Sequence, residues 1–185
     1  MYQKMSIIFL TLFLGACAGL NPNIGERTTD VGWISGNYQQ AFDTAKVYAE
    51  KGYPWAQLRL GIFYENGWGV EKDVKIALDW YQKAAAQTAT GGWANGQIIG
   101  AIGEMGYFNQ NSDALIAKFN LAQIYFEGGA IKRDLNRSLD LVNNVIANSN
   151  GRPVFFCCSF STPRYFTQEQ FTGLKNKIEK ELSAD

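Results

Sequence analysis

Few side chains in this sequence are suited to catalysis. The 185-residue chain contains no histidine, which removes the commonest general base, the usual zinc and haem ligand sets and every histidine-dependent triad. What remains are scattered carboxylates such as Glu104 and Asp113, and the adjacent Cys157 and Cys158. No spacing places a general base beside a nucleophile. We therefore expect no enzymatic activity, no catalytic residues, no metal site and no cofactor.

The adjacent cysteines allow several interpretations. Neighbouring cysteines do not reach a relaxed disulfide geometry with each other, so Cys157 and Cys158 are a strained vicinal pair, two thiols, or partners for another chain. They lack the spacing of a metal site or of a C-x-x-C redox motif. In the stretch "VFFCCSF" they also suit small buried apolar residues. These alternatives stay open.

The third cysteine, Cys17, follows a leader-like segment. Lys4 supplies a positive flank, and the apolar run from Ile7 to Leu14 is shorter than the ~20 residues that a spanning helix needs. An ordinary signal peptide cut after a small residue is one reading. The tetrapeptide Leu-Gly-Ala-Cys ending at Cys17 resembles a bacterial lipobox, in which the cysteine is acylated, for example with palmitate. We expect a lipoprotein signal peptide at 1–16, lipidation of Cys17 and a lipid-anchored linker at 17–35. The residue after the cysteine is Ala18 and not an Asp. In this the sequence resembles lipoproteins that are sent to the outer membrane, so we expect an outer-membrane lipoprotein that faces the periplasm.

The composition is that of a globular protein. Hydrophobic residues make up 46% and charged residues 18% of the chain, which suits one domain with its own core. The formal net charge is zero. A neutral chain lacks the electrostatic footprint of a nucleic-acid-binding protein, so we expect no nucleic-acid partner.

The elements that position these side chains come from an internal repeat. Ala56 matches Ala117, and Asp73 matches Asp134, each pair 61 residues apart. The pairs that keep the same register without a gap are Leu60 with Leu121, Tyr64 with Tyr125, Gly67 with Gly128, Val70 with Ile131 and Leu78 with Leu139. Such agreement predicts one structural unit present twice.

The repeated unit reads as a pair of helices. Small and apolar residues at Ala56, Leu60 and Gly61 share one helical face, and the small ones let a second helix approach closely. Gly67 suits a left-handed residue that ends the first helix. Asp73 suits the N-cap of the second helix. The aromatic residues and carboxylates of this unit are therefore mostly structural.

The motif of the first copy resembles the Sel-like repeat, a branch of the tetratricopeptide-like solenoids. It consists of Ala56, Leu60-Gly61, Tyr64, Gly67-Trp68-Gly69-Val70, Asp73, Ala77, Trp80-Tyr81 and Ala84-Ala85. The second copy departs from it, with Ala122 for Gly61, Ser138 for Ala77 and Leu141-Val142 for Trp80-Tyr81. The resemblance implies an all-α fold, an α/α superhelical solenoid over 36–149, that binds a partner and has no catalytic residues to carry over.

The segments around the two copies complete the predicted architecture. Residues 37–52 read as the second helix of a preceding partial unit. The glycine-rich insertion at 87–112 is either a pair of closely packed helices or an irregular segment. Residues 150–185 read as a loop followed by a capping helix, which starts at a Thr167–Gln170 capping box. The sequence thus predicts roughly seven helices and no sheet beyond a short C-terminal ribbon.

The resemblance and the predicted anchor together suggest a protein-binding module of the bacterial cell envelope. First helices of solenoid repeats usually line a concave binding surface. The partner-binding candidates on those helices are Arg59, Ile62, Phe63, Asn66, Lys118 and Asn120. Arg59, Phe63 and Asn66 have no evident structural task in the sequence pattern. The loop at 154–160 is the next candidate site.

A narrower hypothesis names a toxic partner. Short Sel-like lipoproteins resemble the immunity proteins that neutralise antibacterial phospholipase effectors of type VI secretion in the periplasm. A compact two-repeat chain with its own lipid anchor suits such an inhibitor better than a large assembly platform. Both hypotheses take a protein as the partner and reach the membrane only through the N-terminal lipid.

Overall fold

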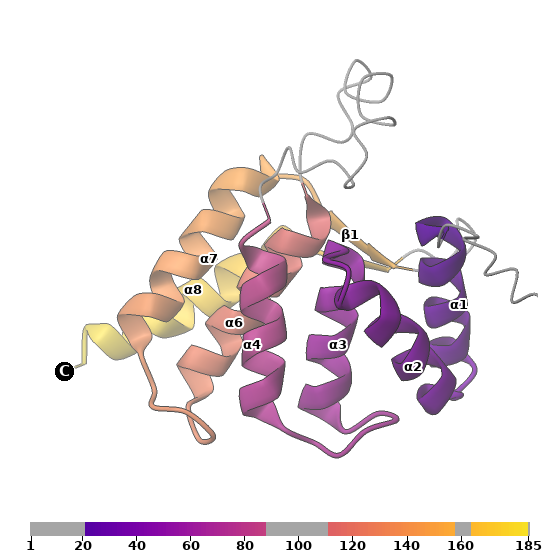
Figure 1. Cartoon of the computed structure of the whole chain (residues 1–185). Helices are drawn as coiled ribbons and strands as arrows, with labels where there is room; N and C mark the ends of the chain where they lie inside the picture. The colour runs from indigo at the N-terminus through magenta and orange to yellow at the C-terminus, as the bar shows by residue number, and fades with distance from the viewer. Residues whose placement is uncertain (1–20, 88–110, 158–163, 185) are drawn as a thin grey trace, which may run out of the picture.

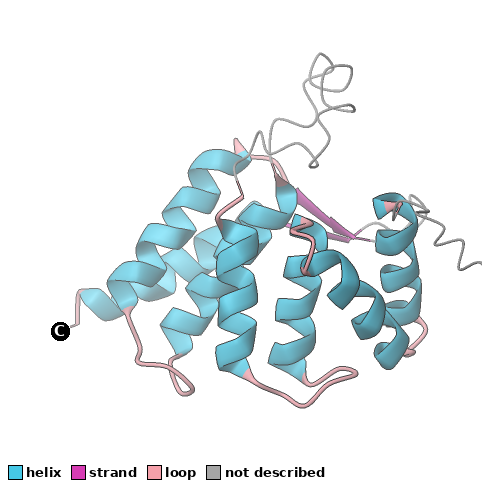
Figure 2. Ribbon diagram, in the orientation of Figure 1, coloured by secondary structure: helices cyan, strands magenta, loops and turns pink. Residues whose placement is uncertain are grey.

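The computed structural model describes residues 21–87, 111–157 and 164–184. These ranges contain seven helices and a two-stranded hairpin, shown in Figure 2. In chain order they are α1 (Pro22–Ile34), α2 (Tyr38–Ala49), α3 (Pro54–Asn66), α4 (Val74–Ala85), α6 (Ser112–Glu127), α7 (Leu135–Ser149), β1 (Val154–Cys157), β2 (Arg164–Phe166) and α8 (Gln168–Leu182). The glycine-rich insertion, whose two interpretations stayed open, falls largely outside the described residues.

The helices pack as consecutive pairs, α1 with α2, α3 with α4 and α6 with α7, and each pair contacts the next (Figure 1). The predicted solenoid of helix pairs is confirmed. The two copies also share one closing hydrogen bond. The Asp73 amide donates to the Tyr64 carbonyl at 2.8 Å, and the Asp134 amide donates to the Tyr125 carbonyl at 2.9 Å.

The helix ends lie where the sequence predicts them. Gly67 ends α3 with φ of 76°, a left-handed conformation that is cheapest for glycine. The Asp73 carboxylate accepts the Lys75 and Ile76 amides at the start of α4. Asp134 caps α7 in the same way, and the Thr167–Gln170 capping box is present at α8.

Close packing of α3 on α4 depends on one glycine. A Cβ on Gly61 would lie 2.3 Å from the ring of Tyr81, which is fully buried. In the second copy Ala122 takes the place of Gly61 and Val142 the place of Tyr81. The larger residue on one helix therefore faces a smaller residue on the other, which keeps the two helices of each pair in contact.

The prediction of a linker at 17–35 is wrong from Pro22 onwards. The Asn21 side chain accepts the amides of Asn23 and Ile24, and Pro22 opens α1 at a position that suits proline. A small-residue stripe faces α2, since a Cβ on Gly25 would lie 2.3 Å from the Tyr48 ring. The unit before the first copy is therefore a complete pair, α1 with α2.

After α7 the chain forms the short antiparallel hairpin of β1 and β2, as predicted. Val154 pairs with Phe166 and Phe155 with Tyr165. The chain then enters α8, whose buried stripe of Phe171, Leu174 and Ile178 packs on the end of the solenoid. The predicted capping helix is thus confirmed.

Candidate functional site

The face formed by the first helices is covered by the chain itself. The hairpin runs from α6 towards α1 (Figure 1). The Phe156 ring of β1 meets the Trp33 ring of α1 edge-on at 5.5 Å. The Phe166 ring of β2 meets Phe119 of α6 at 5.7 Å. The hairpin therefore occupies the face on which the sequence placed a partner.

This cover changes the interpretation of α3. All nine residues from Trp55 to Phe63 are buried, as in a helix surrounded on every side. Phe63 is fully buried against Phe42 of α2, and Ile62 is 9% exposed. The prediction that Ile62 and Phe63 present themselves to a partner is wrong. They are core residues, because α2 covers one side of α3 and the hairpin and α1 cover another.

Arg59 also has a structural task, so its prediction as an exposed interface anchor is wrong. Its side chain is completely buried, and its Nε donates to Asp30 Oδ1 of α1 at 2.9 Å. Its Nη2 donates to the Phe156 carbonyl at 3.1 Å, and its guanidinium lies 4.2 Å from the centre of the Phe156 ring. Arg59 thereby joins α1, α3 and β1, and Asp30 offsets a charge that would otherwise be costly to bury. The Nη1 atom of Arg59 is buried and has no hydrogen-bond partner among the described residues.

Two further carboxyl groups lie in the field of Arg59. Burial, followed by the nearby Asp113 charge, raises the pKa of Glu26 to about 7. Burial also raises the pKa of Asp113 to about 6, and Arg59 opposes that rise. Three carboxyl groups around one guanidinium cannot all ionise cheaply. These groups form a polar cluster inside the fold, and the part of the chain that the structure describes holds no group of residues that could bind a metal ion.

The other three candidates differ in their surroundings. Asn120 is 8% exposed and lies beside the hydroxyl of Tyr81, which donates to Glu65 at 2.5 Å. The prediction of Asn120 as a contact residue is therefore wrong, because it belongs to a buried network. Lys118 donates to Asn144 of α7 at 2.8 Å. Asn66 is exposed, and its side chain donates to the Ile62 carbonyl of its own helix.

An accessible surface with the composition of an interface lies on the outer side of the hairpin. The rings of Phe155 and Tyr165 meet edge-on at 5.7 Å, yet these residues are 42% and 51% exposed. Arg164 is also exposed, but its guanidinium lies 5.4 Å from the centre of the Trp33 ring, which is the ring that the buried Phe156 contacts. Aromatic residues are enriched among the residues that dominate binding energy. We call Phe155 and Tyr165 the hairpin face.

The sequence pattern indicated only part of the hairpin face. The loop at 154–160 was the second candidate site, and Phe155 lies in it. Tyr165 was missed, because its position opposite Phe155 depends on strand pairing. Val154, Phe155 and Phe156 are all apolar, so the alternating exposure that the structure shows along them leaves no signal in the sequence.

The cysteines stand apart from these surfaces. Cys157 is buried and disulfide-bonded, so the interpretation of two free thiols is wrong for this residue. Cys158 and the predicted lipidation site Cys17 lie outside the described residues. Among the described helices, none is both long and apolar enough to cross a bilayer.

Comparison with known proteins agrees with this architecture. The family model of the Sel1 repeat matches residues 56–88 and 115–141, which are the two copies found by internal alignment. The fold is an α/α solenoid built of helix pairs. The chain is a Sel-like repeat protein, with two Sel1 repeats between a preceding helix pair and a C-terminal cap.

Three similar proteins have quite different lengths. The crystal structure of c5321, a protective antigen of uropathogenic Escherichia coli strains displaying an SLR fold, matches with a TM-score of 0.59 and 19% identity, over 87% of this chain and 26% of that one. A Sel1 repeat protein from Oxalobacter formigenes matches with a TM-score of 0.35 and 26% identity, over 77% and 64%. The Saccharomyces cerevisiae chitin synthase regulator SKT5 is 46% identical over 46 residues, which are 25% of this chain and 7% of that protein. The chain thus spans only a small part of c5321 and of SKT5, 26% and 7% of their lengths.

Proposed function

We propose that this chain is a protein-binding module anchored in the bacterial cell envelope, and that the hairpin face is its contact surface. Sel1-repeat proteins are generally protein-interaction modules. The observation that carries the proposal is the exposed aromatic pair of Phe155 and Tyr165 on the outer side of the hairpin. An aromatic pair exposed to this degree gains buried area and stacking when a partner covers it. The proposal includes no catalytic role.

The anchoring part of the proposal rests on the sequence Leu-Gly-Ala-Cys that ends at Cys17. An acylated Cys17 would hold the solenoid at a membrane surface, with the periplasm as the expected location and the outer membrane as the expected anchor. The alternative is that the chain is an immunity protein, which binds and neutralises a phospholipase effector of type VI secretion. Both functions are forms of protein binding. The identity of the partner separates the two.

The test is a pull-down from envelope extract with the purified chain and a double variant, Phe155→Ser with Tyr165→Ser. The variant should recover at least about tenfold less of the specific partner, because removal of central aromatic anchors commonly costs more than 1–2 kcal/mol. A matched control is Val47→Ser, which changes another exposed apolar residue, on α2. Circular dichroism should show all these proteins equally helical.

Equal recovery of the same partner by the folded double variant would exclude the hairpin face. A captured effector would favour the inhibitor hypothesis, and a captured component of an envelope assembly would favour a scaffold. Mass spectrometry of the recovered protein gives this answer directly.

A further inference from the structure

The two Sel1 repeats can be compared at the junction where each meets the preceding helix pair. The first junction is filled by aromatic rings. Trp68 stacks on Tyr38 of α2, with ring centres 5.4 Å apart and planes 13° apart. Phe42 of α2 meets Tyr64 edge-on at 5.4 Å. A Cβ on Gly69 would lie 2.4 Å from the Tyr38 carbonyl oxygen, so the loop after α3 sits directly on the start of α2.

The second junction lacks these rings. With the same offset of 61 residues, Gly129 takes the place of Trp68. When the second helices are aligned at their N-caps, Asn37 and Asp73, Val74 takes the place of Tyr38 and Leu78 that of Phe42. A Cβ on Gly129 would meet nothing within 4 Å. The three aromatic residues of the first junction, Trp68, Tyr38 and Phe42, are therefore replaced in the second by Gly129, Val74 and Leu78, which have smaller side chains or, for glycine, no side chain.

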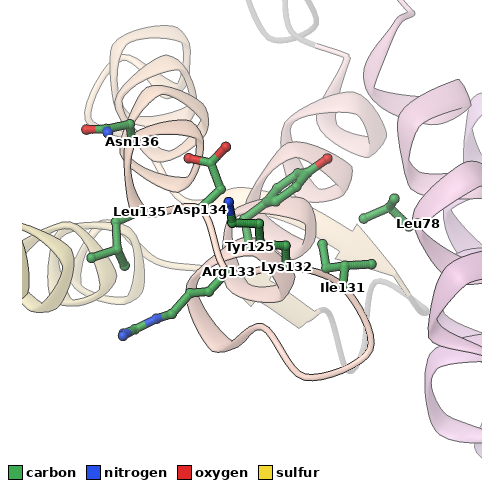
Figure 3. Close-up of a pocket in the computed structure, with 8 residues that line it drawn as sticks. All are labelled: Leu78, Tyr125, Ile131, Lys132, Arg133, Asp134, Leu135 and Asn136. Carbon is green, nitrogen blue, oxygen red and sulfur yellow. The ribbon is translucent and has the colours of Figure 1, made fainter.

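A cleft of about 590 Å³ lies at the second junction, between α4 and the loop that joins α6 to α7. Figure 3 shows the residues that line it. They are Leu78, Tyr125, Ile131, Lys132, Arg133, Asp134, Leu135 and Asn136. A volume of this size lies within the range of pockets that bind ligands, roughly 300–1,000 Å³.

The charged side chains at the rim of the cleft differ in their contacts. Asp134 is occupied as the cap of α7, where its carboxylate accepts the Arg137 amide at 2.9 Å. Arg133 is paired with Glu181 of α8. Lys132 is exposed and makes no ion pair within the part of the chain that the structure describes. In the first junction the matching position is Glu71. The rim is therefore apolar on one side, through Leu78 and Ile131, and offers a free cation on the other.

We propose that this cleft binds an aromatic side chain of a partner protein that is flanked by carboxylates. In the first junction the Phe42 ring packs edge-on against Tyr64, and in the second junction Leu78 and Tyr125 at the matching positions line the cleft. The smaller Leu78 leaves room there for an aromatic ring of a partner. Lys132 supplies the charge that a neighbouring Glu or Asp of the partner would meet. This inference rests on the proposed function, because it takes the occupant of the cleft to be a segment of a partner protein. It adds to the hairpin face a second contact surface with its own specificity.

The probe is the blocked peptide acetyl-Glu-Glu-Trp-Glu-Glu-amide, titrated into the isotope-labelled full chain in detergent micelles. Nuclear magnetic resonance should show saturable shifts of the backbone amides of Gly129, Ala130 and Lys132. The same peptide with Ala for Trp, and the peptide with Lys for every Glu, should each give no saturable shift. Shifts that map to the hairpin face or nowhere would overturn the proposal.

Two variants give the second junction a residue type found in the first. Leu78→Phe supplies the ring that Phe42 supplies there, and Lys132→Glu supplies the charge of Glu71. Each should weaken the peptide at least about fivefold, because one fills the cleft and the other removes the attracting charge. The control Lys46→Glu makes the same charge change at an exposed residue of α2 and should leave the affinity unchanged.

Wild-type affinity in either cleft variant would overturn the proposal. If Leu78→Phe does not fold, the exposed Lys132→Glu decides alone. The double variant of Phe155 and Tyr165 should bind the peptide normally. Failure of the hairpin pull-down and failure of the peptide titration are therefore separate results.

Discussion

Arg59 of α3 and Asp30 of α1 form a buried ion pair, with 2.9 Å between Nε and Oδ1. The Arg59 side chain is 0% exposed and the Asp30 side chain 11% exposed. This contact makes α1 a part of the solenoid. The same guanidinium binds the Phe156 carbonyl, so it also fixes the hairpin over the first helices.

Arg59→Met should destabilise the fold by about 3–5 kcal/mol, because it removes the cation that the buried Asp30 carboxylate faces. Urea denaturation followed by circular dichroism measures the free energy of unfolding. Asn66→Ala on the same helix is the control and should change it by less than about 0.5 kcal/mol, since Asn66 is exposed. Equal stability of Arg59→Met and wild type would mean that the ion pair contributes nothing to the fold.

Gly61→Ala should destabilise the fold by about 1–3 kcal/mol, because the added methyl group meets the Tyr81 ring. Gly173→Ala in α8 meets nothing within 4 Å and should raise stability by roughly 0.5–1 kcal/mol through helix propensity. Thermal unfolding of the two variants should therefore move in opposite directions. A shift of the same sign in both would show that α3 and α4 are not packed as described.

Glu26→Gln should change how stability depends on pH. The folded pKa of Glu26, about 7, lies above its ordinary value of 4.5 because the group is buried. Between these values the unfolded chain has lost this proton while the folded chain keeps it, so the contribution of Glu26 to stability falls as pH rises from about 4.5 to 7. The stability of Glu26→Gln minus that of wild type should therefore be larger at pH 8 than at pH 5.

Melting temperatures of both proteins at pH 5 and pH 8 test this sign. The exposed Glu50→Gln serves as the control, with no expected change in the pH dependence. An unchanged difference between Glu26→Gln and wild type across this range would show that Glu26 ionises normally in the fold.

Cys17→Ser should abolish labelling of the chain by palmitate in growing cells, since the acylated thiol is gone. Globomycin should block processing of the wild type. Ala18→Ser keeps the cysteine and should be labelled. A wild-type protein that matures without label and starts at another residue would contradict the lipoprotein hypothesis.

The sequence alone predicted the elements that depend on near neighbours. Gly67, Asp73 and Thr167 set helix ends through contacts within a few residues, and local patterns of small residues mark the packed faces. The repeat was visible because both copies meet the same local requirements. Helix α1 obeys these rules too, with Asn21 as its cap and Pro22 at its first turn, although the segment was predicted to be a linker.

The candidate site could not be predicted in the same way, since it depends on residues far apart in the chain. Arg59 meets Asp30, 29 residues before it, and Phe156, 97 residues after it. A cation on a helix face is exposed or buried according to which other elements pack on that face. The periodicity of the helix sequence does not predict those elements. The local sequence determined the helix pairs. Only the tertiary structure decided that α1 and the hairpin cover the first helices. It brings the Asp30 carboxylate of α1 and the Phe156 carbonyl of β1 to the buried Arg59 guanidinium, and these contacts are far apart in the chain.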